Sequence, residues 1–153
     1  MERDSKNETK MKIRKFKNKK EAFKYIKKKY SSAEAILIKG SVVRGEIKEF
    51  SDIDIEFYQD KPAKPEYELI LVDNKLVLIT AYPYKAGKKI NNVPENVLVL
   101  KGNYCKQIEN QKPYSKQERT IRDNQMFLDF LFKYLRTKDS KYLKTIEKYS
   151  RLK

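Results

Sequence analysis

The sequence contains no histidine and a single cysteine, Cys105. Without histidine the chain cannot form a His-containing zinc site or a Ser-His or Cys-His catalytic pair, and one cysteine excludes an intramolecular disulfide. No run of 18 apolar residues predicts a membrane span, and the charged first twenty residues lack the apolar core of a secretory signal. We therefore expect a cytoplasmic protein without membrane contact, whose chemistry uses carboxylates, lysines, tyrosines or a hard metal ion.

The net charge of +15 lies mainly at the two ends of the chain. Residues 1–30 carry 13 Lys/Arg against 4 Asp/Glu, residues 31–112 carry 12 of each, and residues 113–153 carry 11 against 5. Basic ends of this kind attract polyanions such as RNA or tRNA, because phosphate contacts release counterions. They are equally typical of a lysine-rich surface that keeps a protein soluble, and charge alone does not separate these two interpretations.

The length of 153 residues fits one domain. Residues 1–17 have few apolar anchors and are predicted to be a basic, disordered arm. Residues 18–153 are predicted to form a single domain that ends in a helical segment over 115–152.

Hydrophobic periodicity predicts an α+β fold for this domain. Helical spacing predicts helices over 19–30 and after Pro113, where Ser115 and Glu118 resemble a capping box, and a shorter one over 139–152. Strands are predicted over 35–38, 51–58, 67–72, 75–82 and 96–101, with a hairpin turn at Asp73-Asn74. The order lacks the strict βαβα alternation of a parallel doubly wound fold.

Two short stretches carry the chemistry. Gly40 and Ser41 follow the apolar run 35–38, and Asp52 and Asp54 alternate with isoleucines in the strand predicted over 51–58. Carboxylates two residues apart on a strand share one face and can hold divalent cations. A glycine lets a phosphate approach the backbone, and a serine adds a hydroxyl and free amides. The alternative is a turn followed by an ordinary strand with a solvated acidic face.

Taken together, G-S at 40–41, R-G at 44–45 and S-D-x-D at 51–54 resemble the nucleotidyltransferase superfamily typified by DNA polymerase beta, in its minimal nucleotidyltransferase branch. The resemblance covers residues 33–82. It implies a small mixed or antiparallel sheet with helices packed on one side. It also implies a Mg²⁺-dependent enzyme, with Mn²⁺ as a substitute, that moves a nucleoside monophosphate from an NTP to an acceptor and releases pyrophosphate.

The same resemblance implies roles for individual residues. Gly40, Ser41 and Arg44 are expected to bind the triphosphate of an NTP, with ATP as the expected nucleotide; for Arg44 the alternative is an ion pair with a nearby glutamate. Asp52 and Asp54 are expected to be catalytic and to hold the metal. Members carry a third carboxylate on a later strand, and alignment places the apolar Val77 there. Glu68 is the predicted substitute, provided that its strand pairs with the D-x-D strand.

The missing third acid leaves a second hypothesis open. The chain is then a catalytically impaired nucleotidyltransferase-like domain that acts as a nucleic-acid-binding or regulatory subunit, or as an antitoxin-type partner of a small helical toxin. The apolar segment 126–135, MFLDFLFKYL, is predicted to be a core helix. Its alternative role is a contact with a helical partner protein or with a second copy of the chain.

Overall fold

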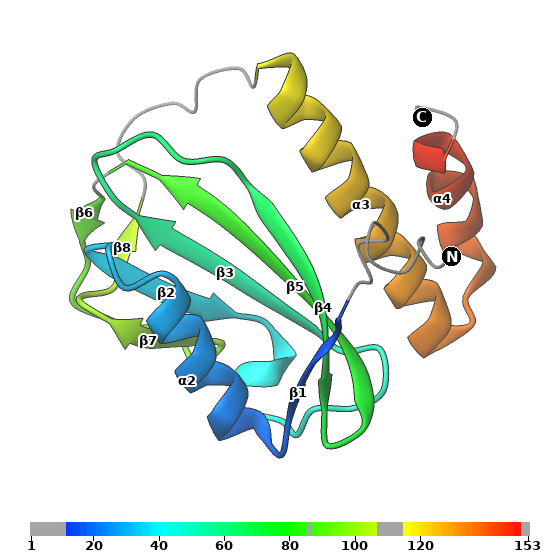
Figure 1. Ribbon diagram of the computed structural model, residues 1–153, viewed down its shortest axis with the longest axis horizontal. Coiled ribbons are helices and arrows are strands. Elements are labelled where there is room, and N and C mark those ends of the chain that lie inside the picture. The colour runs from blue at the N-terminus through cyan, green and yellow to red at the C-terminus, as the bar shows by residue number, and fades with distance from the viewer. Residues whose placement is uncertain (1–11, 86, 107–114, 151–153) are drawn as a thin grey trace, which may run out of the picture.

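A six-stranded mixed sheet forms the centre of the computed structural model, which describes residues 12–85, 87–106 and 115–150 (Figure 1). The strand order is β1-β4-β5-β3-β2-β7. The strands are β1 (Arg14–Phe16), β2 (Ala35–Lys39), β3 (Asp52–Tyr58), β4 (Glu66–Val72), β5 (Lys75–Tyr84) and β7 (Val97–Lys101). Two further short strands, β6 (Lys88–Lys89) and β8 (Cys105–Lys106), pair with each other. The predicted α+β fold class is confirmed, as is the edge strand predicted at 96–101.

Helix α2 (Lys19–Lys29) covers one face of the sheet. The helix begins where the Asn18 side chain accepts a hydrogen bond from the Glu21 amide. Its buried side carries Ala22, Phe23 and Ile26, which pack against isoleucines and valines of the central strands. The alternation along β3 directs Ile53 and Ile55 toward α2, and the described core on this face is apolar.

Helix α3 (Lys116–Thr137) lies over the opposite face of the sheet, and α4 (Leu143–Ser150) packs against α3. The predicted capping box of Ser115 and Glu118 is present at the start of α3. The buried Gln125 side chain fixes the helix by donating to the Glu66 carbonyl at 2.6 Å and to the Ala81 carbonyl at 3.3 Å. The helices thus cover both faces, and not only the one implied by the resemblance. Within the apolar segment 126–135, which was predicted to be a core helix, Phe132 is buried and the other residues are half-buried.

The predicted hairpin is confirmed, and its turn explains the strand order. Asp73 and Asn74 both have positive φ, 51° and 61°, which suits the two-residue turn between β4 and β5. Strand β5 then pairs parallel with β3, so that β4 lies on the outer side of β5. This arrangement decides which residues of the hairpin can approach Asp52 and Asp54.

Part of the segment 1–17, which was predicted to be a disordered arm, forms a strand. Residues 1–11 lie outside the described residues, whereas Arg14–Phe16 form β1 and pair parallel with the end of β4. Phe16 supplies the apolar anchor, because its ring packs against Tyr25 of α2 with centroids 5.1 Å apart. In the part of the chain that the structure describes, no helix is long and apolar enough to cross a membrane.

Candidate active site

Asp52 and Asp54 lie on the face of β3 that is turned away from α2, and Gly40 lies beside them. Gly40 follows the end of β2, whose last residue Lys39 pairs with Asp54 in the sheet. A Cβ atom placed on Gly40 would lie 3.9 Å from Oδ2 of Asp54. Gly40 has a φ of 104°, which side chains rarely adopt, and the exposed Ser41 begins a short 3-10 turn. The G-S and D-x-D stretches, separate in the sequence, therefore meet.

The acidic pair is half-buried and electrostatically strained. Burial, followed by the charge of Asp54, raises the pKa of Asp52 to about 7, although Arg136 of α3 opposes the shift at 3.6 Å from Oδ1. Burial also raises the pKa of Asp54, against the hydrogen bond that the Thr80 hydroxyl donates to its Oδ1 at 2.7 Å. Each charged carboxylate is thus disfavoured by its surroundings, and a cation bound between them would be stabilised.

A third carboxylate, Asp129, reaches the pair from helix α3. Its carboxylate is close enough to Asp52 and Asp54 for its charge to raise the pKa of both. One helical turn later, Lys133 places its Nζ 3.3 Å from Oδ2 of Asp129. The sequence interpretation missed Asp129 because it assigned the segment 126–135 to the core or to a partner. The sequence feature that could have indicated a site residue is that Asp129 is the single acid in this apolar segment.

A cavity of about 280 Å³ opens beside this acidic group, between the sheet and α3. Its floor carries Lys39 and Glu56, whose side chains form an ion pair at 2.9 Å. Arg122 of α3 forms part of the wall, with its guanidinium 4.7 Å from the centre of the Tyr82 ring. The lining residues come from β2, β3, β5 and α3: Lys39, Asp54, Glu56, Tyr82, Tyr84, Arg122 and Asp129. The cavity offers room for a polar ligand next to Asp54.

A sequence profile of the nucleotidyltransferase domain matches residues 19–123. The chain belongs to this family. The matched range begins with α2 and ends within α3, so it contains Gly40, Ser41, Asp52 and Asp54. The resemblance stated from the motifs is confirmed, and nucleotidyltransferase domains generally use divalent metals and an NTP. No curated protein sequence matches the chain.

The strand neighbouring β3 shows where this nucleotidyltransferase differs from the family pattern. The register places Leu78 opposite Asp52 and Thr80 opposite Asp54, so neither of these positions carries an acid. Val77 belongs to the core under α2 and lies on the other face of the sheet. The alignment of the third acid with Val77 was therefore wrong. Successive residues of a strand alternate between the two sides of the sheet, and Val77 lies on the side opposite to Asp52 and Asp54.

The structure does not bring Glu68 to the acidic pair. Glu68 pairs in register with Ile79, so it lies on the α2 face, where it accepts hydrogen bonds from the Tyr25 hydroxyl at 2.6 Å and Lys29 at 3.2 Å. The prediction required β4 to pair with β3, but β5 lies between them. Glu68 thus anchors α2 to the sheet, and the role of third acid is not supported for it.

Arg44, Ser51 and Glu56 each contact another residue of the chain. Arg44 is exposed and forms an ion pair at 2.7 Å with Glu95, which follows it by 51 residues and is therefore not a glutamate nearby in the sequence. Ser51 organises the turn into β3 by accepting from the Lys48 amide at 2.8 Å. Glu56 shares the face of the pair and is held by Lys39.

The donor set of the nucleotidyltransferase site fits a hard divalent cation. Mg²⁺ prefers carboxylate oxygens, and Asp52 and Asp54 present theirs on the same face of β3. Within the described ranges, no group of three or more His, Cys, Asp or Glu side chains could hold a metal ion as it stands. Arg136 and Lys133, which contact Asp52 and Asp129, supply the positive charge present in this arrangement.

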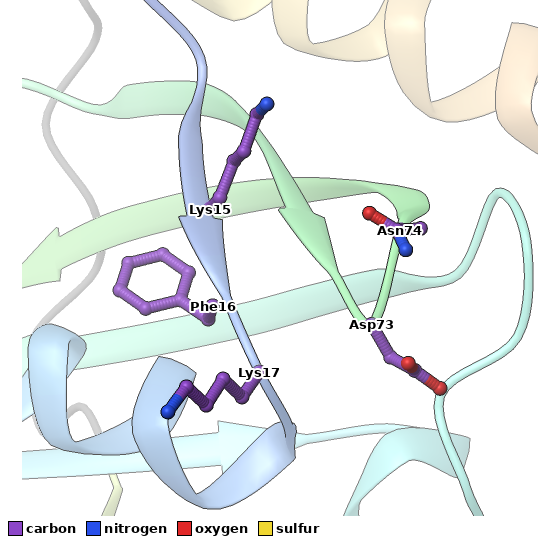
Figure 2. A pocket seen from close by; sticks show the side chains of 5 residues that line it. All are labelled: Lys15, Phe16, Lys17, Asp73 and Asn74. Carbon is purple, nitrogen blue, oxygen red and sulfur yellow. The ribbon is translucent and has the colours of Figure 1, made fainter.

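A second cavity, of about 320 Å³, lies at the other end of the hairpin and contains none of the predicted site residues. Figure 2 shows Lys15 and Lys17 projecting from the β1 segment, and Asp73 and Asn74 at the turn between β4 and β5. The Asp73 amide donates to the Phe16 carbonyl at 2.9 Å, which ties the turn to β1. This second cavity thus lies at the edge of the sheet, and we assign no function to it.

Proposed function

We propose that the protein transfers a nucleoside monophosphate from an NTP to a hydroxyl group of an acceptor, in a reaction that depends on Mg²⁺. The observation that carries this proposal is the meeting of Gly40 with Asp54 at the end of β2. A phosphate that approaches the backbone at Gly40 is then adjacent to two carboxylates suited to hold its counter-cation. Ser41 adds an exposed hydroxyl at the same place.

The chain's own groups account for binding and orientation. Gly40 and Ser41 would bind the outer phosphates, and Asp52 and Asp54 would hold the divalent cations. Mg²⁺, when bound, neutralises the triphosphate and stabilises the leaving pyrophosphate. The acceptor oxygen forms a bond to the α-phosphorus, the bond to the bridging oxygen breaks with its electron pair leaving on pyrophosphate, and the hydroxyl proton is lost to solvent.

ATP is the expected nucleotide and RNA the expected acceptor, with a partner protein as the alternative. The support for RNA is the basic N-terminal part of the chain, which includes α2. Its outward side carries the exposed residues Lys20, Lys24, Lys27 and Lys28. Such a row of ammonium groups suits contact with a phosphate backbone.

The direct test is incubation with Mg²⁺ and each α-labelled NTP, with total RNA and cell protein as acceptors. Wild type is compared with the double variant Asp52→Asn/Asp54→Asn and with Asp60→Asn, an exposed acid outside the site. We expect label from wild type and from Asp60→Asn, and none from the double variant. Equal labelling by the double variant would refute the assignment of the pair, and no labelling by any variant would refute the transfer reaction.

RNA contact has its own test. The triple variant Lys24→Gln/Lys27→Gln/Lys28→Gln is expected to bind RNA more weakly and with a salt dependence reduced by about one unit of slope for each lysine that contacts phosphate. An unchanged slope would remove α2 from the RNA-binding surface.

One observation favours a second candidate function. The β5 positions beside the acidic pair are Leu78 and Thr80, and α3 covers that face with Lys133 and Arg136 close to the carboxylates. This arrangement suits a nucleotidyltransferase domain that has lost catalysis and acts as a nucleic-acid-binding, regulatory or antitoxin-type partner. Retained RNA affinity in Asp52→Asn, without nucleotide transfer by wild type, would support that function.

A further inference from the structure

We propose that Asp129 of helix α3 supplies the third carboxylate of the active site, on the side where the acceptor binds. The proposal rests on the proposed transfer reaction. It assigns to a helix the position that a strand residue holds in the family pattern. Leu78 and Thr80, the two residues of β5 that neighbour Asp52 and Asp54, carry no charge.

The position of Asp129 follows from the packing of α3. Gln125, one turn before Asp129, is fixed to backbone carbonyls of β4 and β5 at 2.6 Å and 3.3 Å. Phe132, almost one turn after Asp129, is buried and meets the Phe50 ring edge-on with centroids 5.7 Å apart. Residues three or four apart share one side of a helix, so these anchors turn Asp129 toward the sheet. Its side chain is only 19 % exposed.

The cavity places Asp129 on the acceptor side. Asp54 and Asp129 line it together, whereas Gly40 and Ser41 do not. The pyrophosphate leaves toward Gly40, and an acceptor oxygen that attacks in line with the leaving group approaches from the other side of the α-phosphate. A carboxylate at the cavity wall is therefore suited to hold a second cation at the acceptor oxygen, while Asp52 and Asp54 hold the one that carries the nucleotide.

Lys133 explains why the three carboxylates are not already arranged as a cation site. Its ammonium group lies 3.3 Å from Oδ2 of Asp129 and neutralises the charge of that carboxylate. A divalent cation at Asp129 has to replace this contact. Removal of the Lys133 charge should therefore strengthen cation binding, and removal of the Asp129 charge should weaken it.

The test counts bound cations independently of catalysis. Mn²⁺ binding is followed by electron paramagnetic resonance in the presence of a non-hydrolysable ATP analogue. Wild type is compared with Asp129→Asn and with Asp123→Asn, which removes an acid of the same helix that does not line the cavity. We expect two Mn²⁺ ions for wild type and Asp123→Asn. For Asp129→Asn we expect one tight ion and a second bound at least about 10-fold more weakly, because loss of a ligand costs no less than loss of an outer-shell partner.

The Lys133→Gln variant tests whether removal of the positive charge strengthens cation binding. It also tests the role of Asp129 if Asp129→Asn does not fold. It should bind the second Mn²⁺ more tightly than wild type, whereas Lys116→Gln, an exposed lysine of the first turn, should not. Asp129→Asn that matches Asp123→Asn in Mn²⁺ binding and in transfer would overturn the role of Asp129 and leave the proposed function intact. Wild type that binds neither Mn²⁺ nor the analogue would overturn both.

Discussion

Replacement of Asp52 by asparagine is predicted to stabilise the metal-free protein. Asp52 has its pKa raised from an ordinary 3.8 to about 7, first by burial and then by the charge of Asp54. A shift of about 3 units at 1.36 kcal/mol per unit costs the folded state about 4 kcal/mol above pH 7, where the carboxylate is ionised. Asparagine keeps the shape of the side chain and carries no charge, so it avoids this cost.

The raised pKa of Asp52 also determines how the free energy of unfolding changes with pH. Because the folded state holds the Asp52 proton more tightly than the unfolded state, stability is greatest below about pH 4 with respect to this group. It is lost as the pH rises from about 4 to about 7. The advantage of Asp52→Asn should therefore be absent at pH 4 and approach its full size at pH 8. For a chain of this length, about 4 kcal/mol corresponds to an increase in Tm on the order of 10 °C.

Differential scanning calorimetry of both proteins in EDTA between pH 4 and pH 8 measures this difference. Asp60→Asn, which removes an exposed negative charge, is the control for a change in net charge. Addition of Mg²⁺ should then stabilise wild type and have little effect on Asp52→Asn. A variant that is less stable than wild type at pH 8, or a difference in Tm that does not change with pH, would refute the electrostatic reasoning.

Three further substitutions test other contacts. Gly40→Ala forces a side chain into a φ of 104° and should cost about 1–3 kcal/mol in urea unfolding, as well as weaken binding of an ATP analogue measured by calorimetry; unchanged binding would exclude Gly40 from the phosphate site. Gln125→Met leaves two carbonyl acceptors without their donor and should cost about 1–3 kcal/mol, whereas an equal urea midpoint would mean that α3 is held by other contacts. Thr80→Val removes the hydroxyl that lowers the pKa of Asp54, so Mn²⁺ affinity should fall, and fall further as the pH is lowered; a parallel pH profile would contradict this.

The sequence predicted most of the elements because their signals are local. The alternation of Asp52, Ile53 and Asp54 indicates which side of β3 belongs to the apolar core, and the Asp73-Asn74 pair indicates the hairpin. The face and partner of a later strand are not local properties. Val77 and Glu68 were misplaced because their relation to Asp52 depends on β5 pairing parallel with β3, a contact between segments about 25 residues apart.

Asp129 was beyond a strand-based argument for the same reason. It lies 75 residues after Asp54, and only the docking of α3 on the sheet brings the two together. The Arg44–Glu95 pair likewise joins two loops that the sequence does not connect. In contrast, the proximity of Gly40 to Asp54 was accessible, because adjacent strands joined by a short connection usually pair.

The central position of β3 has a consequence for how loss of activity is interpreted. Strand β3 is bonded on one side to β2 and on the other to β5, so its amides are covered along both edges. Such amides exchange with solvent only through opening of the whole sheet, and their exchange rates report global unfolding. An inactive variant whose β3 amides exchange as slowly as those of wild type has therefore lost a reacting group and kept its fold, and hydrogen exchange at this one strand distinguishes the two causes.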